Sequence, residues 1–170
     1  DNISTAAVVV LTYPGLEVVE SITKSQPTPF PYVPGLLTFR EGPVLVEAFE
    51  ALQHTPDVFM FDGMGRIHPR RTGIAAHMGL WLGMPTVGVG KTHFIGTYDE
   101  PGVLKGSYSP ITDKGDVIGN LLRTRDKVKP VYVSVGHLAD LQTATELTLA
   151  CSPKYRLPHP IRMAHNTAGK

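Results

Sequence analysis

The sequence predicts a single mixed α/β domain, and three observations lead to this prediction. Its 170 residues, 42% apolar and 18% charged, are typical of one globular domain with its own core. Three short apolar runs, at 58–61, 86–89 and 131–135, alternate with stretches of helical spacing. A β-branched run at the start is joined to a second run by a Pro-Gly turn. We therefore expect parallel central strands covered by helices on both faces, with an antiparallel hairpin in front of them.

The first 36 residues are predicted to form a hairpin followed by a stiff loop. Residues 4–12 are rich in β-branched side chains, residues 16–22 are a second strand candidate, and Tyr13-Pro-Gly15 is the turn between them. Residues 26–36 contain four prolines and two aromatic residues. This density of proline excludes a helix and indicates a stiff, irregular segment.

The rest of the chain alternates helices and strands. Apolar spacing, N-cap residues and glycine stops predict where each helix begins and ends. The expected elements beyond the three apolar strands are a helix over 37–52 with Gly42-Pro43 opening its regular part, a helix over 72–82, two antiparallel strands within 101–124, a helix over 140–150 with Asp140 as its cap, and a helix after Pro160.

Composition and motifs narrow the function. No run is long and apolar enough for a membrane span, and Cys151 is the single cysteine, so we expect a cytoplasmic protein without a disulfide or a cysteine zinc site. Lys and Arg number five against eight Asp and Glu in residues 1–85, and eleven against seven in residues 86–170. The P-loop of nucleoside-triphosphate-binding proteins, the dinucleotide-binding glycine motif and the serine-hydrolase motif are absent. Carboxylates, histidines and cations around glycine loops remain, and these groups suit metal-assisted phosphodiester hydrolysis.

Asp62 is the most informative carboxylate. It ends an apolar strand and precedes Gly63-Met-Gly65, where backbone can approach a ligand closely. In open α/β sheets the functional residues lie beyond the carboxyl ends of the strands, which here carry Asp62, Lys91 and His137. Asp62 is either a ligand of a divalent ion, which takes carboxylates together with phosphate oxygens, or a local turn cap.

Other candidate residues allow both a functional and a structural interpretation. Lys91 could contact a phosphate or face solvent, and Glu41 could bind a metal ion or compensate a helix dipole. Tyr32, held between prolines, could enter a base stack or pack within the protein. The segment from Arg66 to Arg71, which includes His68, is either a phosphate-binding loop or a solvated basic loop.

Seven segments, taken together and in order, resemble the endonuclease V family, and they span nearly the whole chain. They are Phe30-Pro-Tyr-Val-Pro-Gly35, Leu37-Thr-Phe-Arg-Glu-Gly-Pro43, Pro56-Asp-Val-Phe-Met-Phe-Asp-Gly-Met-Gly65, His68-Pro-Arg-Arg-Thr-Gly-Ile-Ala-Ala-His-Met-Gly79, Pro85-Thr-Val-Gly-Val-Gly-Lys91, Val133-Ser-Val-Gly-His137, and Tyr155-Arg-Leu-Pro with Arg162-Met-Ala-His165.

The resemblance implies an RNase H-like mixed sheet flanked by helices. It also implies a Mg²⁺-dependent endonuclease, with Mn²⁺ as a substitute, that repairs deaminated adenine. The family nicks the second phosphodiester bond on the 3′ side of hypoxanthine. The expected partner is therefore inosine-containing DNA, or RNA, between which the sequence does not choose, and we expect a monomer with no membrane partner.

The resemblance also assigns roles by position. Asp62, Glu41 and His165 are expected to bind the metal ion, and Lys91 and His68 to complete the catalytic set. The remaining assignments are Tyr32 as the wedge that replaces a displaced base, Gly35, Leu37, Gly63, Gly65, Gly90 and Phe94 in the base pocket, and Arg40, Arg70 and Arg71 at the phosphates.

The sequence departs from the family at Gly90, where alanine is usual, and at its two ends. The family's N-terminal helix and its first strand, which carries another catalytic aspartate, lie upstream of residue 1, and we do not equate Asp1 with that aspartate. We therefore expect domain 1–170 to be truncated at its N-terminus and at its C-terminus. The alternative to an active nuclease is a catalytically impaired chain that binds inosine or nucleic acid, and a trimmed copy of an ordinary enzyme is a third interpretation.

Overall fold

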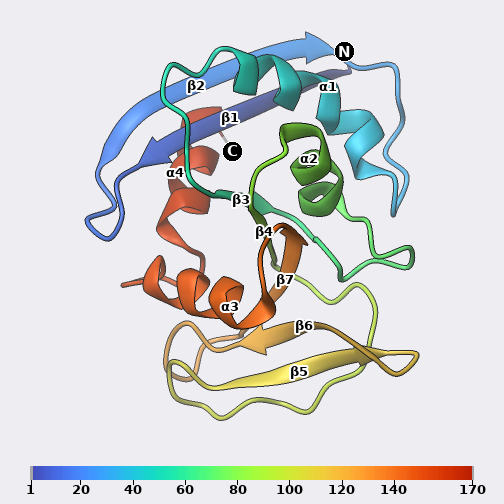
Figure 1. The fold of residues 1–170 in the computed structure, drawn as a ribbon, viewed down its shortest axis with the longest axis vertical. Coiled ribbons are helices and arrows are strands. Elements are labelled where there is room, and N and C mark those ends of the chain that lie inside the picture. Colours follow the sequence, from blue (N-terminus) through green and yellow to red (C-terminus); the bar gives the residue numbers. More distant parts are fainter. Residues whose placement is uncertain (1, 170) are drawn as a thin grey trace.

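The computed structural model describes residues 2–169, so that Asp1 lies outside the described residues. The chain forms a central sheet with helices on both faces and a long hairpin at one end (Figure 1). No helix within residues 2–169 is long and apolar enough to cross a membrane. The elements are β1 (Ile3–Leu11), β2 (Val18–Pro27), α1 (Leu37–Glu50), β3 (Phe59–Asp62), α2 (Ile74–Leu82), β4 (Thr86–Gly90), β5 (Tyr108–Asp113), β6 (Asp116–Leu122), β7 (Val131–His137), α3 (Leu141–Ala150) and α4 (His159–Ala168).

The central sheet has five strands in the order β3-β4-β7-β6-β5. β3 and β4 are parallel, in the register that pairs Asp62 with Val89. β7 is antiparallel to both β4 and β6, so the expectation of three parallel strands is wrong for residues 131–135. The reason is the connection: between β4 and β7 the chain forms the β5–β6 hairpin, and no crossover helix returns it to the start of the sheet.

The N-terminal hairpin is a separate two-stranded sheet. β1 and β2 pair antiparallel from Ile3 opposite Pro27 to Leu11 opposite Val18, with one irregularity after Val10. The predicted hairpin is confirmed, but β2 extends through residue 27 and takes up the start of the segment predicted as a stiff loop. Pro27 is compatible with a strand because β2 is an edge strand of a two-stranded sheet, where a missing backbone donor is tolerated. The irregular loop is therefore limited to residues 28–36.

Helices cover both faces of the central sheet. On one face, α1 and α2 pack against the aromatic side chains of β3, Phe59 and Phe61. On the other face, α3 and α4 pack against the valines of β4 and β7, with Ala144 and Ile161 buried in the contact. Short strands covered on both faces have to be apolar on both faces, which explains the continuous apolar runs in the sequence.

Helix α1 contains a proline in its interior. The sequence predicts that Gly42-Pro43 opens the regular part of this helix, but the helix begins at Leu37 and passes through Pro43. A proline removes one backbone donor, and the carbonyl that loses its partner is that of Phe39, four residues earlier. Phe39 is exposed, so this turn of the helix borders solvent, where the loss is tolerated.

Candidate active site

A carboxylate, an ammonium group and an imidazole meet at the carboxyl ends of β3 and β4. Lys91 Nζ lies 3.0 Å from Asp62 Oδ2 and 3.1 Å from His165 Nε2. His165 Nε2 lies 2.5 Å from the same oxygen of Asp62. The three side chains are between 26% and 36% exposed, so that a ligand can reach them while the protein still screens them from much of the solvent.

The topology explains how residues so far apart in the sequence come together. Because β3 and β4 are parallel, their carboxyl ends lie at the same edge of the sheet. Asp62 is the last residue of β3, and Lys91 directly follows β4. Helix α4 packs against β1 and β3 and carries His165 in its last turn. Three of the five catalytic residues that the resemblance implies, Asp62, Lys91 and His165, are thus brought into mutual contact, whereas Glu41 and His68 are not part of it.

Arg156, which lies in the Tyr155-Arg-Leu-Pro segment but is not among the candidate site residues, fixes the backbone behind Lys91. Its guanidinium donates to the carbonyl of Lys91 at 2.7 Å and to those of Lys129 and Pro130 at 2.8 and 2.9 Å. One side chain therefore ties the end of β4 to the start of β7. No sequence signal reveals this role, because all three acceptors are backbone carbonyls and depend only on the fold.

A cavity of about 640 Å³ lies between the N-terminal hairpin and the central sheet. It is lined by consecutive residues of β1 and of β3, by α1 and by α4. Most of the lining is apolar, and Cys151 reaches it from the end of α3. Burial raises the pKa of the Cys151 thiol, which keeps it protonated near neutral pH.

Two unpaired strand edges face this cavity. Within residues 2–169, β1 pairs with β2 alone and β3 with β4 alone. The second edge of each strand therefore has N–H and C=O groups without a strand partner, and both strands line the same cavity. Figure 1 shows β1 running above β3, with α4 on one side and α1 on the other.

Glu41, Asp62 and His165, the three predicted metal ligands, all line this cavity. Asp62 and His165 are in direct contact, and Glu41 enters from the first turns of α1. In the described part of the chain, however, no three His, Cys, Asp or Glu side chains form a group that could hold a metal ion. The predicted ligand set is thus gathered around one cavity without forming a closed site.

The predicted wedge and base-pocket residues lie on the loops before α1, after β3 and after β4, except for Leu37 in α1 and Gly90 in β4. Tyr32, in the loop between β2 and α1, is 68% exposed, and Gly35 has a positive φ of 84° just before α1. Leu37, the first residue of α1, is half-buried and packs against the core cluster around Phe59 and Phe61. Phe94, in the loop after β4, lies 5.9 Å from the ring of His68, measured between ring centroids.

Three predicted pocket glycines, two that follow β3 and one that ends β4, have close packing contacts. A Cβ atom at Gly65 would lie 2.1 Å from the carbonyl oxygen of Val135, and one at Gly90 would lie 2.3 Å from Met64 Cε. Gly63 has a φ of 159° and faces Ile74. These glycines let the loop after β3 lie directly on β4 and β7. Whether their backbone also contacts a base stays a prediction.

The predicted catalytic His68 is buried, at 4% exposure, and contacts protein backbone. Its Nε2 donates to the carbonyl of Gly35 at 2.9 Å, and its Nδ1 accepts from the N–H of Arg70 at 3.1 Å. Burial lowers the pKa of His68, an effect that the hydrogen bond to Gly35 opposes and the charge of Arg70 reinforces. The ring is therefore neutral near neutral pH.

The arginines predicted at the phosphates also contact protein groups. Arg40 donates to the carbonyl of Phe30 at 2.8 Å, and Arg70 reaches the carbonyl of Gly35 at 3.3 Å. Arg71 pairs with Asp113 at 2.9 Å and so fastens the loop after β3 to the β5–β6 hairpin. Contact of these arginines with phosphate stays a prediction.

These features define the class of protein. It is an α/β enzyme whose carboxylate, imidazole and ammonium groups gather at the carboxyl ends of adjacent parallel strands, beside a large cavity. Comparison with known proteins then identifies the family. The family model of endonuclease V matches residues 1–166. The chain belongs to the endonuclease V family, whose members are nucleases that hydrolyse phosphodiester bonds.

Curated relatives agree with this assignment. Endonuclease V of Trichormus variabilis is 51% identical over 167 residues, which cover 98% of this chain and 76% of the relative. Endonuclease V of Kosmotoga olearia is 50% identical over 159 residues, covering 93% of this chain and 70% of the relative. The family assignment drawn from the sequence motifs is therefore confirmed.

Solved structures of the family have the same fold. Endonuclease V of Streptomyces avermitilis superposes with a TM-score of 0.95 at 45% identity, covering 99% of this chain and 74% of that one. The catalytic domain of human endonuclease V gives 0.91 at 34% identity, with 99% and 75% coverage. Endonuclease V of Ciona intestinalis, solved with a 24mer DNA containing an inosine followed by a ribo-adenosine, gives 0.85 at 28% identity, with 99% and 78% coverage. The predicted mixed α/β fold flanked by helices is confirmed.

Proposed function

We propose that this chain is a metal-dependent endonuclease that nicks the second phosphodiester bond on the 3′ side of inosine. The observation that carries the proposal is the contact of Asp62 with both Lys91 and His165 at the end of β3. The Ciona relative, which is bound to inosine-containing DNA, supports the choice of substrate. Repair of deaminated adenine is the role that this specificity serves.

The residues around Asp62 have the donor chemistry that a divalent cation requires. Asp62 and Glu41 supply carboxylate oxygens, which suit Mg²⁺, and His165 supplies an imidazole nitrogen, which suits Mn²⁺. Lys91 Nζ lies 3.0 Å from Asp62, so the carboxylate already attracts a cation. Asp62, Glu41 and His165 would hold the ion. A bound ion would supply a more acidic water molecule and offset charge on the phosphate.

Lys91 and His165 have separate tasks in this proposal. The Lys91 ammonium group binds the scissile phosphate and stabilises the negative charge that develops on its oxygens. Arg156 keeps it in place by holding the Lys91 carbonyl. His165 Nε2 donates a hydrogen bond to Asp62 Oδ2 and so orients that carboxylate, and the same nitrogen would give up its proton to hold the ion.

Base recognition involves the loop that carries Tyr32. An exposed aromatic ring on a proline-rich loop can occupy the gap that an extruded base leaves in a duplex. Gly35, Phe94 and the glycines after β3 and β4 would surround the extruded hypoxanthine. Because the 2′-hydroxyl is read by loop geometry, DNA and RNA both remain candidate substrates.

The third carboxylate of the centre is proposed to come from an extended segment in the cavity between β1 and β3. Both edges that face the cavity have unpaired backbone groups, and a strand laid between them would pair with both. Glu41, Asp62 and His165 line the same cavity, so a carboxylate on that strand would join them. This proposal follows the sequence-based expectation of an additional strand carrying an aspartate.

A labelled oligonucleotide with one inosine tests the nuclease function. In Mg²⁺ or Mn²⁺, a chain extended upstream by the expected strand and aspartate should nick it at the second bond on the 3′ side, residues 1–170 alone should nick it poorly, and EDTA should stop the reaction. Asp62→Asn should lower nicking by at least ~100-fold, because it removes the central carboxylate of the metal site. An oligonucleotide with adenosine in place of inosine is the control, and nicking that persists in EDTA would contradict the proposal.

A second candidate function is inosine or nucleic-acid binding without cleavage. It is favoured by the lack of a three-residue metal group within residues 2–169. A gel-shift titration on the same oligonucleotide separates the two functions. Equal binding by the extended chain and by its Asp62→Asn variant, without nicking by either in Mg²⁺ or Mn²⁺, would favour the binding protein.

A further inference from the structure

The loop that carries Tyr32 makes few hydrogen bonds of its own. Residues 28–36 contain three of the chain's prolines, which lack a backbone donor. The internal backbone hydrogen bond of this segment runs from the N–H of Leu36 to the carbonyl of Val33, at 3.0 Å. Tyr32 itself is 68% exposed. The position of the loop therefore depends on side chains that reach it from elsewhere.

Arg40 holds the first part of the loop from α1. Its Nη1 donates to the carbonyl of Phe30 at 2.8 Å, and its Nη2 donates to the Asn2 side chain at 3.0 Å. The ring of Phe30 is stacked on that of Phe39, with 5.7 Å between centroids. A guanidinium group can reach two acceptors in this fixed geometry, whereas an ammonium group cannot.

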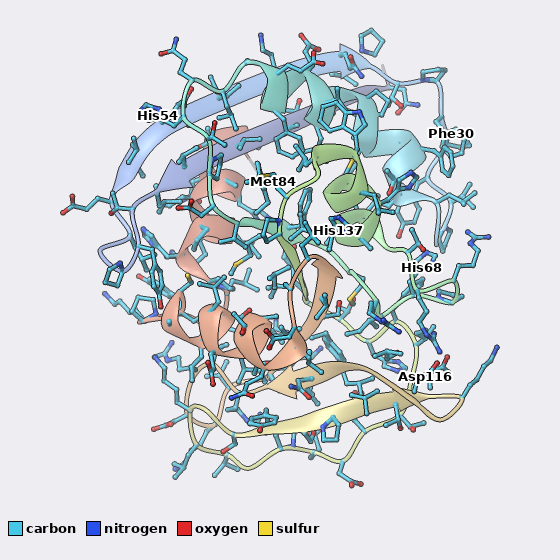
Figure 2. The ribbon with its side chains drawn as sticks, viewed as in Figure 1. Phe30, His54, His68, Met84, Asp116 and His137 are labelled. Atoms are coloured by element: carbon cyan, nitrogen blue, oxygen red, sulfur yellow. The ribbon has the colours of Figure 1, made fainter. Side chains whose placement is uncertain are left out.

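His68 holds the last part of the loop from the connection between β3 and α2. Gly35 carbonyl can only accept and Arg70 N–H can only donate, so His68 must carry its proton on Nε2 and leave Nδ1 free to accept. The ring is buried and lies against Phe94. Figure 2 shows Phe30 and His68 on the same side of the molecule, one above the other.

We propose that Arg40 and His68 are positioning residues that clamp the segment from Phe30 to Gly35 at its two ends and so fix where Tyr32 enters the duplex. Neither residue has to touch the nucleic acid for this role. An aromatic side chain that is ordered in advance loses less entropy on binding, so the clamp increases affinity. The inference rests on the proposed function, in which Tyr32 replaces a displaced base.

Two substitutions of His68 form a matched pair. His68→Gln keeps a donor near the position of Nε2, whereas His68→Asn keeps an acceptor near Nδ1 but cannot reach Gly35. We expect His68→Asn to weaken binding to an inosine-containing duplex about tenfold, the effect of one lost hydrogen bond, and His68→Gln to stay within about twofold. Equal losses for both variants would overturn the clamp at this end.

A double-mutant cycle shows whether the effect passes through Tyr32. In a Tyr32→Ala background, His68→Asn should cost less than about twofold in duplex affinity, because the side chain it positions is gone. A loss of the same size with and without Tyr32 would mean that His68 only maintains the fold, and would refute the proposal. Thermal unfolding of each variant identifies any that are not folded, and if His68→Asn is one of them, Arg40→Lys carries the test with the same Tyr32→Ala comparison.

Arg40→Lys tests the other end. It keeps the positive charge, so a residue that only binds phosphate would retain most of its affinity. A clamping residue would lose about as much as His68→Asn, because lysine cannot span Phe30 and Asn2. The loss of duplex affinity caused by Arg40→Lys should likewise disappear in the Tyr32→Ala background. Retention of full affinity by Arg40→Lys would exclude Arg40 from the clamp.

A measurement without nucleic acid keeps this test independent of the proposed function. The chain has one tryptophan, Trp81, so Tyr32→Trp combined with Trp81→Phe gives a single fluorescent reporter in the loop. His68→Asn should lower its fluorescence anisotropy and His68→Gln should not. If the parent chain does not bind the inosine-containing duplex but His68→Asn still lowers the anisotropy of the reporter, the proposed function fails and the clamp remains. An unchanged reporter overturns the clamp itself.

Discussion

The two sides of Asp62 are built differently. Toward β4, Lys91 contacts the carboxylate, Arg156 holds the Lys91 backbone, and β4 is paired with a neighbour along both edges. Toward β1, Asp62 borders a cavity of about 640 Å³ with an unpaired strand edge on each side. The cationic half of the candidate active site is therefore fixed by packing, whereas the half that has to supply carboxylates is open.

This difference shows which contacts hold the catalytic side chains in place. Catalytic groups need positions set to within fractions of an ångström, and groups lying against an open cavity lack the support for this. Lys91 is ordered by the strand that it follows and by three carbonyl contacts of Arg156. Asp62 has equivalent support on one side only. Experiments on the two sides should consequently give effects of different kinds.

The largest effect is expected from filling the open side. A chain extended upstream by the strand and aspartate expected of the family should nick an inosine-containing oligonucleotide in Mg²⁺, whereas residues 1–170 alone should nick it poorly. We expect a difference of at least ~100-fold, since a third carboxylate completes the site. Changing the added aspartate to asparagine should restore the low rate. Equal rates for the short and extended chains would refute the division into a fixed and an open half.

A smaller effect is expected from disturbing the fixed side. Arg156→Met leaves the carbonyls of Lys91, Lys129 and Pro130 without this donor. The free energy of unfolding should fall by about 1 kcal/mol, because the hydrogen bonds are lost but the acceptors are only partly buried and solvent replaces part of the donor. The nicking rate of the extended chain should fall about tenfold at saturating substrate, because Lys91 is displaced.

Arg125→Met is the matched control for this change, since Arg125 is an exposed basic residue on the segment that precedes β7. It should change neither the free energy of unfolding nor the nicking rate by a measurable amount. If both substitutions lower activity equally, the loss reflects a general reduction of positive charge, and Arg156 has no special part in the fixed half.

The smallest expected effect is a pH dependence of the free energy of unfolding, which arises at His68, outside the cavity. Burial lowers the pKa of His68 below its ordinary 6.5 in the folded chain, whereas the unfolded chain keeps the ordinary value. Below about pH 6.5 the unfolded chain therefore takes up a proton first, and the free energy of unfolding falls as the pH decreases toward the folded pKa. Above that pH both states are neutral and the contribution disappears. Urea unfolding between about pH 7.5 and 5.5 should show a shallower decline for His68→Gln than for the parent chain.

The sequence predicts most elements of the fold because each has a local signature. Asp140 is an example, since a carboxylate in front of helical spacing predicts a cap, and its Oδ1 accepts from the N–H of Thr143 at 2.8 Å. The direction of β7 has no such signature. An apolar run indicates that a strand is buried on both faces, but it contains no information about the direction of the strand. The direction of β7 follows only from the β5–β6 hairpin that precedes it.

The residues of the candidate site likewise fall into those that the sequence predicts and those that only the structure reveals. Asp62 and Lys91 are found from the sequence because they end apolar strands, and His165 is found through the family motif alone. The roles of Arg156 and of Arg40 remain hidden, because their acceptors are carbonyls brought close by the fold. The basic neighbours of His68 suggest a phosphate-binding loop and the family resemblance places it in the catalytic set, but its burial against Gly35 depends on the path of a distant loop.

The unpaired edge of β1 has a consequence for the local stability of the chain. The amide protons of β4 are shared with strands on both sides, so their exchange with solvent deuterium requires the central sheet to open. Within residues 2–169, the amide protons of β1 that point toward the cavity have no such partner strand. They should exchange by small local openings, within a strand whose other protons, bonded to β2, exchange slowly. This alternation along one strand would change to uniform protection once an extended segment occupies the cavity.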